Sequence, residues 1–245
     1  MIQVSRIPFE RLNPDSQIVF FTGAGISAES GLATFRDPDG HWAKHDPMQL
    51  ASRAGFQQDQ ELVLSWYAQR RKNALRADPN DAHRTITRFQ KLFPHSVVIT
   101  QNVDGLHARA GNQRILELHG NLHRTKCFLC HRPLALPDGA QSVTCSCGGA
   151  GRPDVVWFGE NLDPSLLSEA MEYSRNCDLF FSIGTSNQIF PAGELPYLAR
   201  KAGAIVIEIN PQATPFSPLA DQSLREPAGV VLPALYKEFH EAFAA

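Results

Sequence analysis

Five apolar runs of strand length are the feature that most constrains the fold of this chain. They are near-continuous rather than alternating, which is typical of strands buried on both faces of a parallel sheet. The runs are Ile18–Thr22, Val97–Thr100, Ile115–Leu118, Leu179–Ile183 and Ile205–Ile209. Helical patterns lie between and after them, at about residues 82–92, 164–174, 191–201 and 233–244. Strands that alternate with helices predict an α/β fold with a doubly wound parallel, Rossmann-like sheet.

Two stretches of the chain do not follow this alternation. Residues 28–79 begin with a loop rich in Gly and Asp and continue into a helical pattern, and residues 122–155 contain most of the cysteines. We expect both to be insertions that form a smaller module, partly helical and partly metal-binding. The chain would then be one domain, 1–245, whose larger part consists of residues 1–27, 80–121 and 156–245.

Composition and charge exclude several classes of protein. Hydrophobic residues make up 43% of the chain, which is enough to form a core, so we do not expect disorder. The apolar runs are far shorter than the roughly 20 residues that cross a bilayer, and no signal peptide is recognised. A net charge of −2 gives no electrostatic reason to bind nucleic acid or an anionic membrane. We therefore expect a cytoplasmic protein with no nucleic-acid or membrane partner.

Four of the five cysteines form two close pairs in the second insertion. The pairs are Cys127-x-x-Cys130 and Cys145-x-Cys147. Four thiolates suit a tetrahedral zinc ion, and a closed sulfur site of this kind is structural, because no position is left for water. The second pair is tighter than usual, so His123 or His131 remains an alternative to Cys145. Cys177 begins an apolar run and is expected to be a small core residue.

A short glycine turn follows the first apolar run. Gly23-Ala24-Gly25 would let backbone N–H groups approach a pyrophosphate, next to the start of a helix. Ala28 replaces the third glycine of the usual dinucleotide fingerprint, so an ordinary tight turn remains the alternative.

Polar side chains gather at the ends of the other four runs. The segments are Thr100-Gln101-Asn102-Val103-Asp104, Glu117-Leu118-His119-Gly120, Gly184-Thr185-Ser186 and Glu208-Ile209-Asn210. Ligands of doubly wound sheets bind at the carboxyl ends of the strands, so these segments predict one shared crevice. His119 is the best candidate for a general base, because imidazole titrates near neutral pH. A core histidine bonded to the backbone is the alternative.

Together these segments closely resemble the sirtuins, the NAD-dependent protein-lysine deacylases. They occur in the family's order and cover nearly the whole chain. The glycine motif from Gly23 to Gly31 and the Gln101-Asn102-Val103-Asp104 segment are the most specific. The other matching segments are Thr34-Phe35-Arg36, Leu118-His119-Gly120, the four cysteines, Arg152 to Glu160, Gly184-Thr185-Ser186 and Glu208-Ile209-Asn210.

The resemblance implies that NAD is a co-substrate and that acylated lysines of proteins or peptides are the substrates. His119 and Asn102 are implied to be catalytic, with His119 as base on a ribose hydroxyl. The residues implied to bind NAD are Gly23, Ala24, Gly25, Ser27, Phe35, Arg36, Gln101, Asn102, Asp104, Gly184, Thr185, Ser186, Asn210 and Ala228. Cys127, Cys130, Cys145 and Cys147 are implied to hold one structural zinc ion. The segment implied to pair with the substrate backbone is Val156, Trp157, Phe158 and Gly159.

Tyr67 and Arg70 bear on the nature of the acyl group. Positions i and i+3 share one face of a helix, and a guanidinium with a phenol can hold a carboxylate. From spacing alone, a solvated arginine beside a packed tyrosine is the simpler interpretation. However, Tyr-x-x-Arg resembles the signature of the desuccinylase-type (class III) sirtuins, and Thr34 before Phe35 points the same way. The resemblance therefore implies removal of succinyl and malonyl groups, with acetyl groups as further substrates.

Three other functions are alternatives to deacylation. A mono-ADP-ribosyltransferase on the same fold would not need the Tyr67 and Arg70 pair. A non-catalytic zinc-binding module that senses NAD would not need the full set of polar residues at the strand ends. A dehydrogenase would need an acidic residue about 20 positions after the glycine turn, at a second strand end, and none is found there.

Overall fold

Two β-sheets organise the chain in a computed structural model that describes residues 7–34 and 46–243. The larger sheet has six strands in the order β3-β2-β1-β7-β8-β9, and all neighbouring pairs are parallel. Its strands are β1 (Ile18–Thr22), β2 (Val97–Thr100), β3 (Ile115–Glu117), β7 (Leu179–Ile183), β8 (Ile205–Ile209) and β9 (Gln222–Leu224). This confirms the predicted doubly wound sheet. The strand order reverses between β1 and β7, where such sheets bind ligands.

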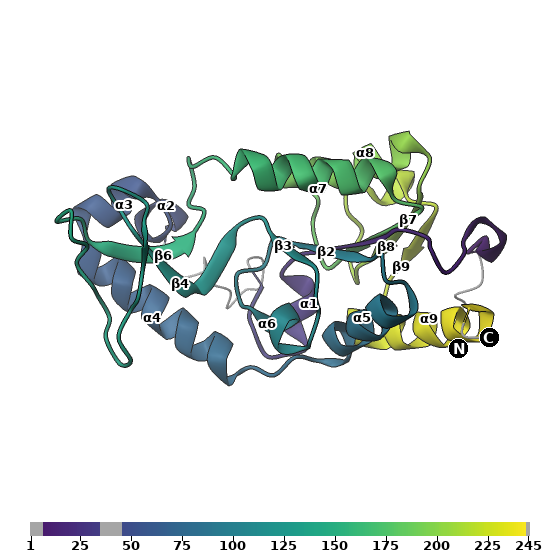
Figure 1. Ribbon diagram of the computed structural model, residues 1–245, viewed down its shortest axis with the longest axis horizontal. Coiled ribbons are helices and arrows are strands. Elements are labelled where there is room, and N and C mark those ends of the chain that lie inside the picture. Colours follow the sequence, from purple (N-terminus) through teal and green to yellow (C-terminus); the bar gives the residue numbers. More distant parts are fainter. Residues whose placement is uncertain (1–6, 35–45, 244–245) are drawn as a thin grey trace.

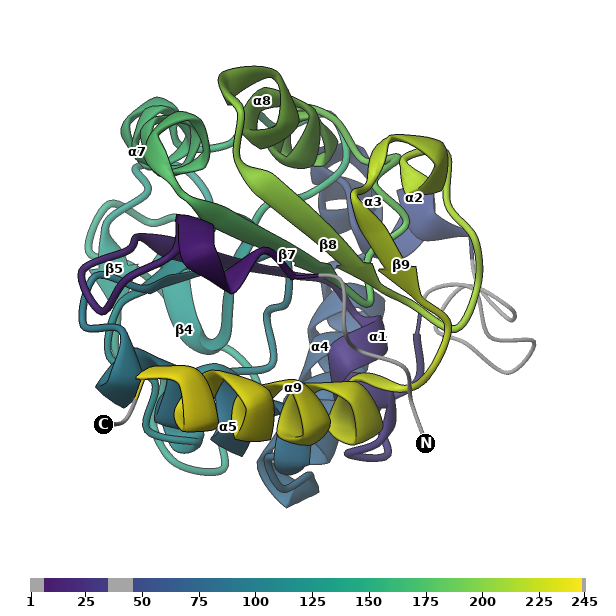
Figure 2. The ribbon, with the colours of Figure 1, turned by 90° about the vertical axis from the view of Figure 1, so that its right-hand side faces the viewer.

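Helices cover both faces of the six-stranded sheet (Figure 2). On one face lie α5 (Asp81–Leu92) and α9 (Ala228–Phe243), and on the other lie α7 (Pro164–Asn176) and α8 (Leu195–Ala202). Successive residues of β1 therefore pack into the two hydrophobic cores on opposite faces of the sheet. Phe20 packs with Phe89 and Phe181, whereas Phe21 packs with Phe180. Burial on both faces explains why the strands are apolar at every position.

Local capping signals fix the starts of two of these helices. The side chain of Asn80 accepts a hydrogen bond of 3.0 Å from the N–H of Ala82 at the start of α5. Asp163 accepts one of 2.9 Å from the N–H of Ser165, and Pro164 occupies the first position of α7. These side chains satisfy N–H groups that have no partner inside the helix.

The structure corrects the predicted bounds of the last helices. α9 begins at Ala228 rather than Pro233, and Pro233 lies inside it. The buried face of α9 packs on the sheet, and this packing outweighs the missing proline N–H. The helix expected at residues 191–201 begins as a 3₁₀ turn, Ala192–Glu194, before α8. The edge strand β9 was not predicted, because it is short and largely polar.

The smaller sheet lies at the left of Figure 1 and has three antiparallel strands in the order β5-β4-β6. The elements of this part are α2 (Pro47–Leu50), α3 (Arg53–Gln58), α4 (Gln60–Arg76), β4 (Gly120–Cys127), β5 (Pro133–Leu134) and β6 (Gly151–Val155). The strands β4, β5 and β6 were not predicted from the sequence. These strands carry polar residues, and pairing with a partner strand defines them rather than a local apolar pattern.

The remaining short elements are α1 (Gly25–Ala28), α6 (Leu106–Arg109) and the 3₁₀ turns Phe9–Arg11 and Ser217–Leu219. Within residues 7–34 and 46–243, no helix combines the length and the apolar character needed to cross a membrane. The exact boundaries between the larger and smaller parts stay a prediction.

Candidate active site

Three glycines bring the turn after β1 against the turn after β7. The N–H of Gly23 donates to the carbonyl of Ile183 (3.0 Å), and the N–H of Gly25 donates to that of Gly184 (2.9 Å). A Cβ added at Gly184 would lie 2.5 Å from the backbone nitrogen of Ile26, and the φ of Gly184 is +58°. These glycines therefore permit a close approach of two backbones at the point where the strand order reverses.

A buried polar cluster joins this turn to the end of β2. The Nδ2 atom of Asn102 donates to the carbonyl of Gly23 (3.1 Å) and to Oγ of Ser27 (3.2 Å). The hydroxyl of Ser27 donates to Oδ2 of Asp104 at 2.7 Å. Three residues selected from two separate motifs thus form one hydrogen-bonded unit.

Asp104 is held as a buried hydrogen-bond acceptor. Burial raises the pKa of its carboxyl group, and hydrogen bonds from the Leu106 N–H and from Ser27 oppose this rise. The Leu106 N–H lies 2.9 Å from Oδ1. His123 fixes the backbone here, because its Nε2 lies 2.9 Å from the Asp104 carbonyl oxygen. A carboxylate in this setting can accept a hydrogen bond from an amide group of a ligand.

His119 follows β3, and its ring contacts the end of the neighbouring strand β2. Its Nδ1 atom is 3.0 Å from the carbonyl oxygen of Gln101, and the side chain of Gln101 donates to Oγ1 of Thr185 at 2.8 Å. Burial lowers the pKa of His119 below its usual value, and the hydrogen bond with Gln101 partly opposes this. A neutral imidazole of this kind can act as a base near pH 7.

A cavity of about 300 Å³ opens beside the glycine turn. It is lined by Gly25, Ala28, Glu29, Gly184, Ile209, Pro211, Pro227 and Ala228. The side chain of Asn210 donates to the Thr185 carbonyl (2.9 Å) and so ties the ends of β7 and β8 together. Ser186, next to Thr185, is partly buried. A mostly apolar wall with few polar groups suits a flat aromatic ring of a ligand.

Glu208 was expected to face the shared crevice at the strand ends, and the structure shows a different position. It is fully buried and bonds within the protein rather than facing the crevice. Its carboxylate accepts hydrogen bonds from Thr214, from Ser217 (2.6 Å) and from Ser223 (3.2 Å), and pairs with Arg225 (2.6 Å). Glu208 therefore anchors the loop after β8, which contributes Pro211 to the cavity wall.

The four predicted cysteine ligands converge at one point of the smaller part. Their sulfur atoms all lie within 4.8 Å of one another, with distances of 3.5 Å for Cys127 to Cys147 and 3.7 Å for Cys130 to Cys145. A tetrahedral ion with zinc–sulfur bonds of 2.3 Å requires sulfur atoms about 3.8 Å apart. The four thiolates fit zinc, and His123 is engaged elsewhere. His131 is not a member of the cluster.

The segment from Val156 to Gly159 is tied firmly to its surroundings. The N–H of Val156 donates to the carbonyl of His119 (2.9 Å), and that of Phe158 donates to the carbonyl of Ala51 (2.8 Å). The side chain of Phe158 is 45% exposed, whereas Trp157 is buried. Gly159 has a φ of +81° and turns the chain back. The segment thus presents one exposed aromatic side chain, two residues after the backbone bond to His119.

Tyr67 and Arg70 lie on the face of α4 that packs toward β4 and β6. Tyr67 is 2% exposed, and its hydroxyl accepts a hydrogen bond of 2.9 Å from Nε1 of Trp157. The guanidinium of Arg70 stacks on the ring of Trp66, 4.7 Å from its centroid. In the described part of the chain, no carboxylate lies within 4.0 Å of Arg70. Burial lowers the pKa of Arg70, and the nearby Tyr67 and Asp104 oppose this.

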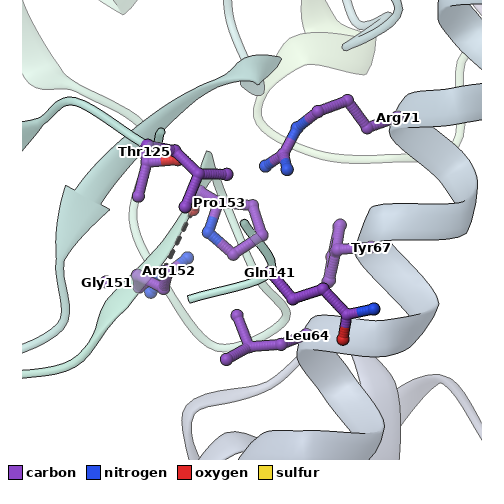
Figure 3. A pocket seen from close by; sticks show the side chains of 9 residues that line it. Leu64, Tyr67, Arg71, Thr125, Gln141, Gly151, Arg152 and Pro153 are labelled. Atoms are coloured by element: carbon purple, nitrogen blue, oxygen red, sulfur yellow. Dashed lines mark hydrogen bonds between the residues drawn. The ribbon is translucent and has the colours of Figure 1, made fainter. Parts of the chain in front are cut away.

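The contact between α4 and the smaller sheet is tightly packed (Figure 3). Leu64, Tyr67 and Arg71 extend from α4 toward Thr125, Arg152 and Pro153, and the gap between them is only about 10 Å³. A gap of that size holds at most about one water molecule. Tyr67 is therefore fixed by packing on the side that faces the smaller sheet.

Sequence reasoning missed two features of the site. One is the hydrogen bond between Trp157 and Tyr67, which lie far apart in the sequence. The other is a buried histidine pair, His83 and His107, whose ring centroids are 4.9 Å apart. His107 bonds Thr22 at the end of β1 (3.0 Å), and its position shortly after the Thr100 to Asp104 segment was its only sequence signal. The predicted NAD contacts of Phe35 and Arg36 lie outside the described residues.

Comparison with known proteins gives a consistent result. A model of a family described as the Sir2 family matches residues 23–191. A protein of Aquifex aeolicus named NAD-dependent protein deacylase is 43% identical over 93% of this chain and 97% of its own length. A protein of Aeropyrum pernix with the same name is 49% identical over 84% of this chain and 86% of its own.

Solved structures agree with these relatives. A Sir2 homologue bound to NAD shares 40% identity and a TM-score of 0.87 over 94% of this chain and 92% of its own. A mutant Sir2 homologue bound to ADP-ribose has a TM-score of 0.89 at 40% identity, over 94% of this chain and 95% of its own. A Sir2 variant with a deacetylated peptide and 3′-O-acetyl-ADP-ribose has a TM-score of 0.79 at 30% identity, covering 91% and 93% of the two chains.

Proposed function

The chain belongs to the Sir2 family, and we propose that it removes succinyl and malonyl groups, and also acetyl groups, from lysine side chains of proteins. Its reaction is an NAD-dependent deacylation, in which NAD and water are consumed. Nicotinamide, the free lysine and an O-acyl-ADP-ribose are the products. The four clustered cysteines would hold a structural zinc ion that supplies stability to the smaller sheet and no catalytic step.

His119 and the buried polar cluster divide the catalytic work between them. Nε2 of His119 would take the proton from a ribose hydroxyl, since Nδ1 is occupied by the Gln101 carbonyl. Asp104 would accept a hydrogen bond from the carboxamide N–H of nicotinamide. Asn102, which bonds Gly23 and Ser27, would hold the NAD pocket in shape and orient the ribose. The cavity lined by Ala228 suits the adenine ring.

In the described part of the chain no carboxylate pairs with the Arg70 guanidinium, and this observation favours an acidic acyl group. A partly buried arginine without a carboxylate partner is costly, and a carboxylate on the substrate would offset this cost. Arg70 interacts with the Tyr67 side chain on the same helix, and Tyr67 is buried. Asp104 is one of the groups that oppose the lowering of the Arg70 pKa, so the carboxylate of the reaction centre acts on this guanidinium electrostatically. Succinyl and malonyl groups end in a carboxylate that such a pair could bind.

The substrate main chain would pair with the segment from Val156 to Gly159. The N–H groups of Val156, Trp157 and Phe158 already donate within the protein. A substrate strand would therefore pair with carbonyl groups and with the N–H of Gly159. Pairing of this kind reads main chain, so we expect a loose preference for the sequence around the lysine.

The test compares two peptides of one sequence, one with succinyl-lysine and one with acetyl-lysine, in the presence of NAD. Mass spectrometry would follow the free-lysine peptide and the O-acyl-ADP-ribose. We expect Arg70→Met to lower kcat/KM for the succinyl peptide by more than tenfold, because charge-assisted hydrogen bonds contribute about 1.5–3 kcal/mol. The value of kcat/KM for the acetyl peptide should fall far less.

Arg71→Met is the matched control on the same helix. Arg71 donates to the Leu122 carbonyl at 2.8 Å and has a different environment from Arg70. The control should keep the wild-type ratio of succinyl to acetyl rates. If Arg70→Met leaves this ratio unchanged, the enzyme is a general deacylase and the proposed acyl preference is wrong.

A further inference from the structure

Trp157 is held in a single orientation by a buried ion pair. The guanidinium of Arg152 lies over the Trp157 ring, 3.3 Å from its centroid, and Arg152 is fully buried. Glu160 binds Arg152 through both oxygens, at 2.5 and 3.0 Å, and also accepts the backbone N–H of Trp157 at 3.0 Å. Phe56 packs against the indole, with ring centroids 5.3 Å apart. The indole therefore has little freedom to rotate.

The direction of the Trp157 N–H determines what the Tyr67 hydroxyl can do. An indole N–H can only donate, so the phenol oxygen of Tyr67 must be the acceptor in their 2.9 Å hydrogen bond. The Arg70 guanidinium, 5.6 Å from the centroid of the Tyr67 ring, is also only a donor. The proton of the phenol must then point away from both groups.

The Tyr67 proton has no acceptor among residues 7–34 and 46–243. Burial raises the pKa of Tyr67, which keeps the phenol protonated near neutral pH. A buried O–H without an acceptor costs about 1–3 kcal/mol, so a ligand that supplies an acceptor is favoured. The phenol is thus a fixed donor next to a fixed cation.

We propose that Trp157 is a positioning residue for acyl selectivity, because its N–H turns the Tyr67 hydroxyl into a donor toward the carboxylate of an acidic acyl group. This inference rests on the proposed preference for succinyl and malonyl groups. It assigns Trp157, which belongs to the substrate-pairing segment, a second task that acts through Tyr67. Arg152 and Glu160 support that task by fixing the indole.

The test replaces the indole N–H while keeping the ring. Trp157→Phe retains an aromatic ring under Arg152, and benzothienylalanine at position 157 retains the bicyclic shape with sulfur in place of N–H. For both variants we expect the ratio of kcat/KM for succinyl to acetyl peptide to fall about fivefold to tenfold, mainly through KM for the succinyl peptide. The ratio is taken within one protein, so a partly unfolded preparation does not alter it.

Tyr67→Phe separates this inference from the proposed function. If Tyr67→Phe and Arg70→Met both leave the ratio unchanged, the acyl preference itself is wrong. If they lower the ratio but benzothienylalanine at position 157 does not, the acyl preference stands and the role of Trp157 is refuted. Combining Trp157→Phe with Tyr67→Phe should lower the ratio no further than Tyr67→Phe alone, since the first change acts through the second residue. Additive effects would refute the inference.

Discussion

The Nδ1 atom of His119 lies 3.0 Å from the main-chain carbonyl oxygen of Gln101. A carbonyl oxygen only accepts hydrogen bonds, so Nδ1 carries the proton and Nε2 of the neutral ring is left with its lone pair. Gln101 in turn is fixed by its side-chain bond to Thr185 at 2.8 Å. The end of β2 thus sets both the tautomer and the direction of the candidate base.

The rate of deacylation should therefore fall on acidification. Because burial lowers the pKa of His119, the neutral ring persists at pH 7 and protonation begins only below the usual value of about 6.5. Single-turnover rates between pH 8 and 5 should be constant at first and then fall up to tenfold per pH unit. His119→Gln should lower the rate by about 10²- to 10⁴-fold. A His119→Gln enzyme that keeps the wild-type rate and pH profile would exclude His119 as the base.

Gly184→Ala should destabilise the protein and abolish tight NAD binding. Its Cβ would approach the Ile26 backbone nitrogen, and φ at this position is +58°. Gly203→Ala is the matched control, because Gly203 also has a positive φ but no atom within 4 Å of an added Cβ. Each change should cost about 1–3 kcal/mol from backbone strain alone, with a further loss at Gly184. Thermal unfolding and NAD titration would distinguish them, and equal effects on NAD binding would contradict the close-approach argument.

Removal of zinc should unfold the three-stranded sheet. Cys147→Ser and Cys145→Ser should each lose bound metal, since both sulfur atoms belong to the cluster. Hydrogen exchange should then rise in β4 and β6 while β1 and β7 stay protected. Cys177→Ala is the control, because Cys177 is a buried thiol whose pKa burial raises to about 12. If Cys145→Ser keeps the zinc, a ligand other than this thiolate completes the site.

The buried pair of His83 and His107 should make folding stability depend on pH. Burial lowers the pKa of His83 to about 4, and burial also lowers the pKa of His107 well below its usual value. The unfolded chain then binds protons that the folded chain does not, so stability is complete above pH 6.5 and falls as the pH drops toward 4. For His83 alone the loss is about 3 kcal/mol.

His83→Asn tests this dependence, because an asparagine amide can keep the 3.0 Å contact that Nδ1 makes with Asn80. Its free energy of unfolding should change less between pH 6.5 and 4 than that of the wild type. Identical pH profiles for the two proteins would show that His83 is not the titrating group. The same variant separates unfolding from protonation of His119 in the activity profile.

Local patterns predicted the parts of the molecule that depend on local chemistry. The strands β1, β2, β7 and β8 were found because burial on both faces leaves an unbroken apolar run. The cysteines that could bind zinc were found because two close pairs of thiols have few other uses in such a chain. β4, β6 and β9 were missed, since their polar residues follow from pairing with strands far along the chain.

The sequence by itself determined the class of fold, the glycine turn at the end of β1 and the presence of a cysteine cluster in the smaller part. Only the tertiary structure showed that the Glu208 carboxylate binds residues of the protein interior instead of facing the crevice. It also showed that Trp157 donates a hydrogen bond to Tyr67, 90 positions away in the chain. Residue type and spacing encode burial and backbone preference, which act over a few residues. Contacts between distant residues depend on how packed elements close together, and their hydrogen-bond directions follow only from that packing.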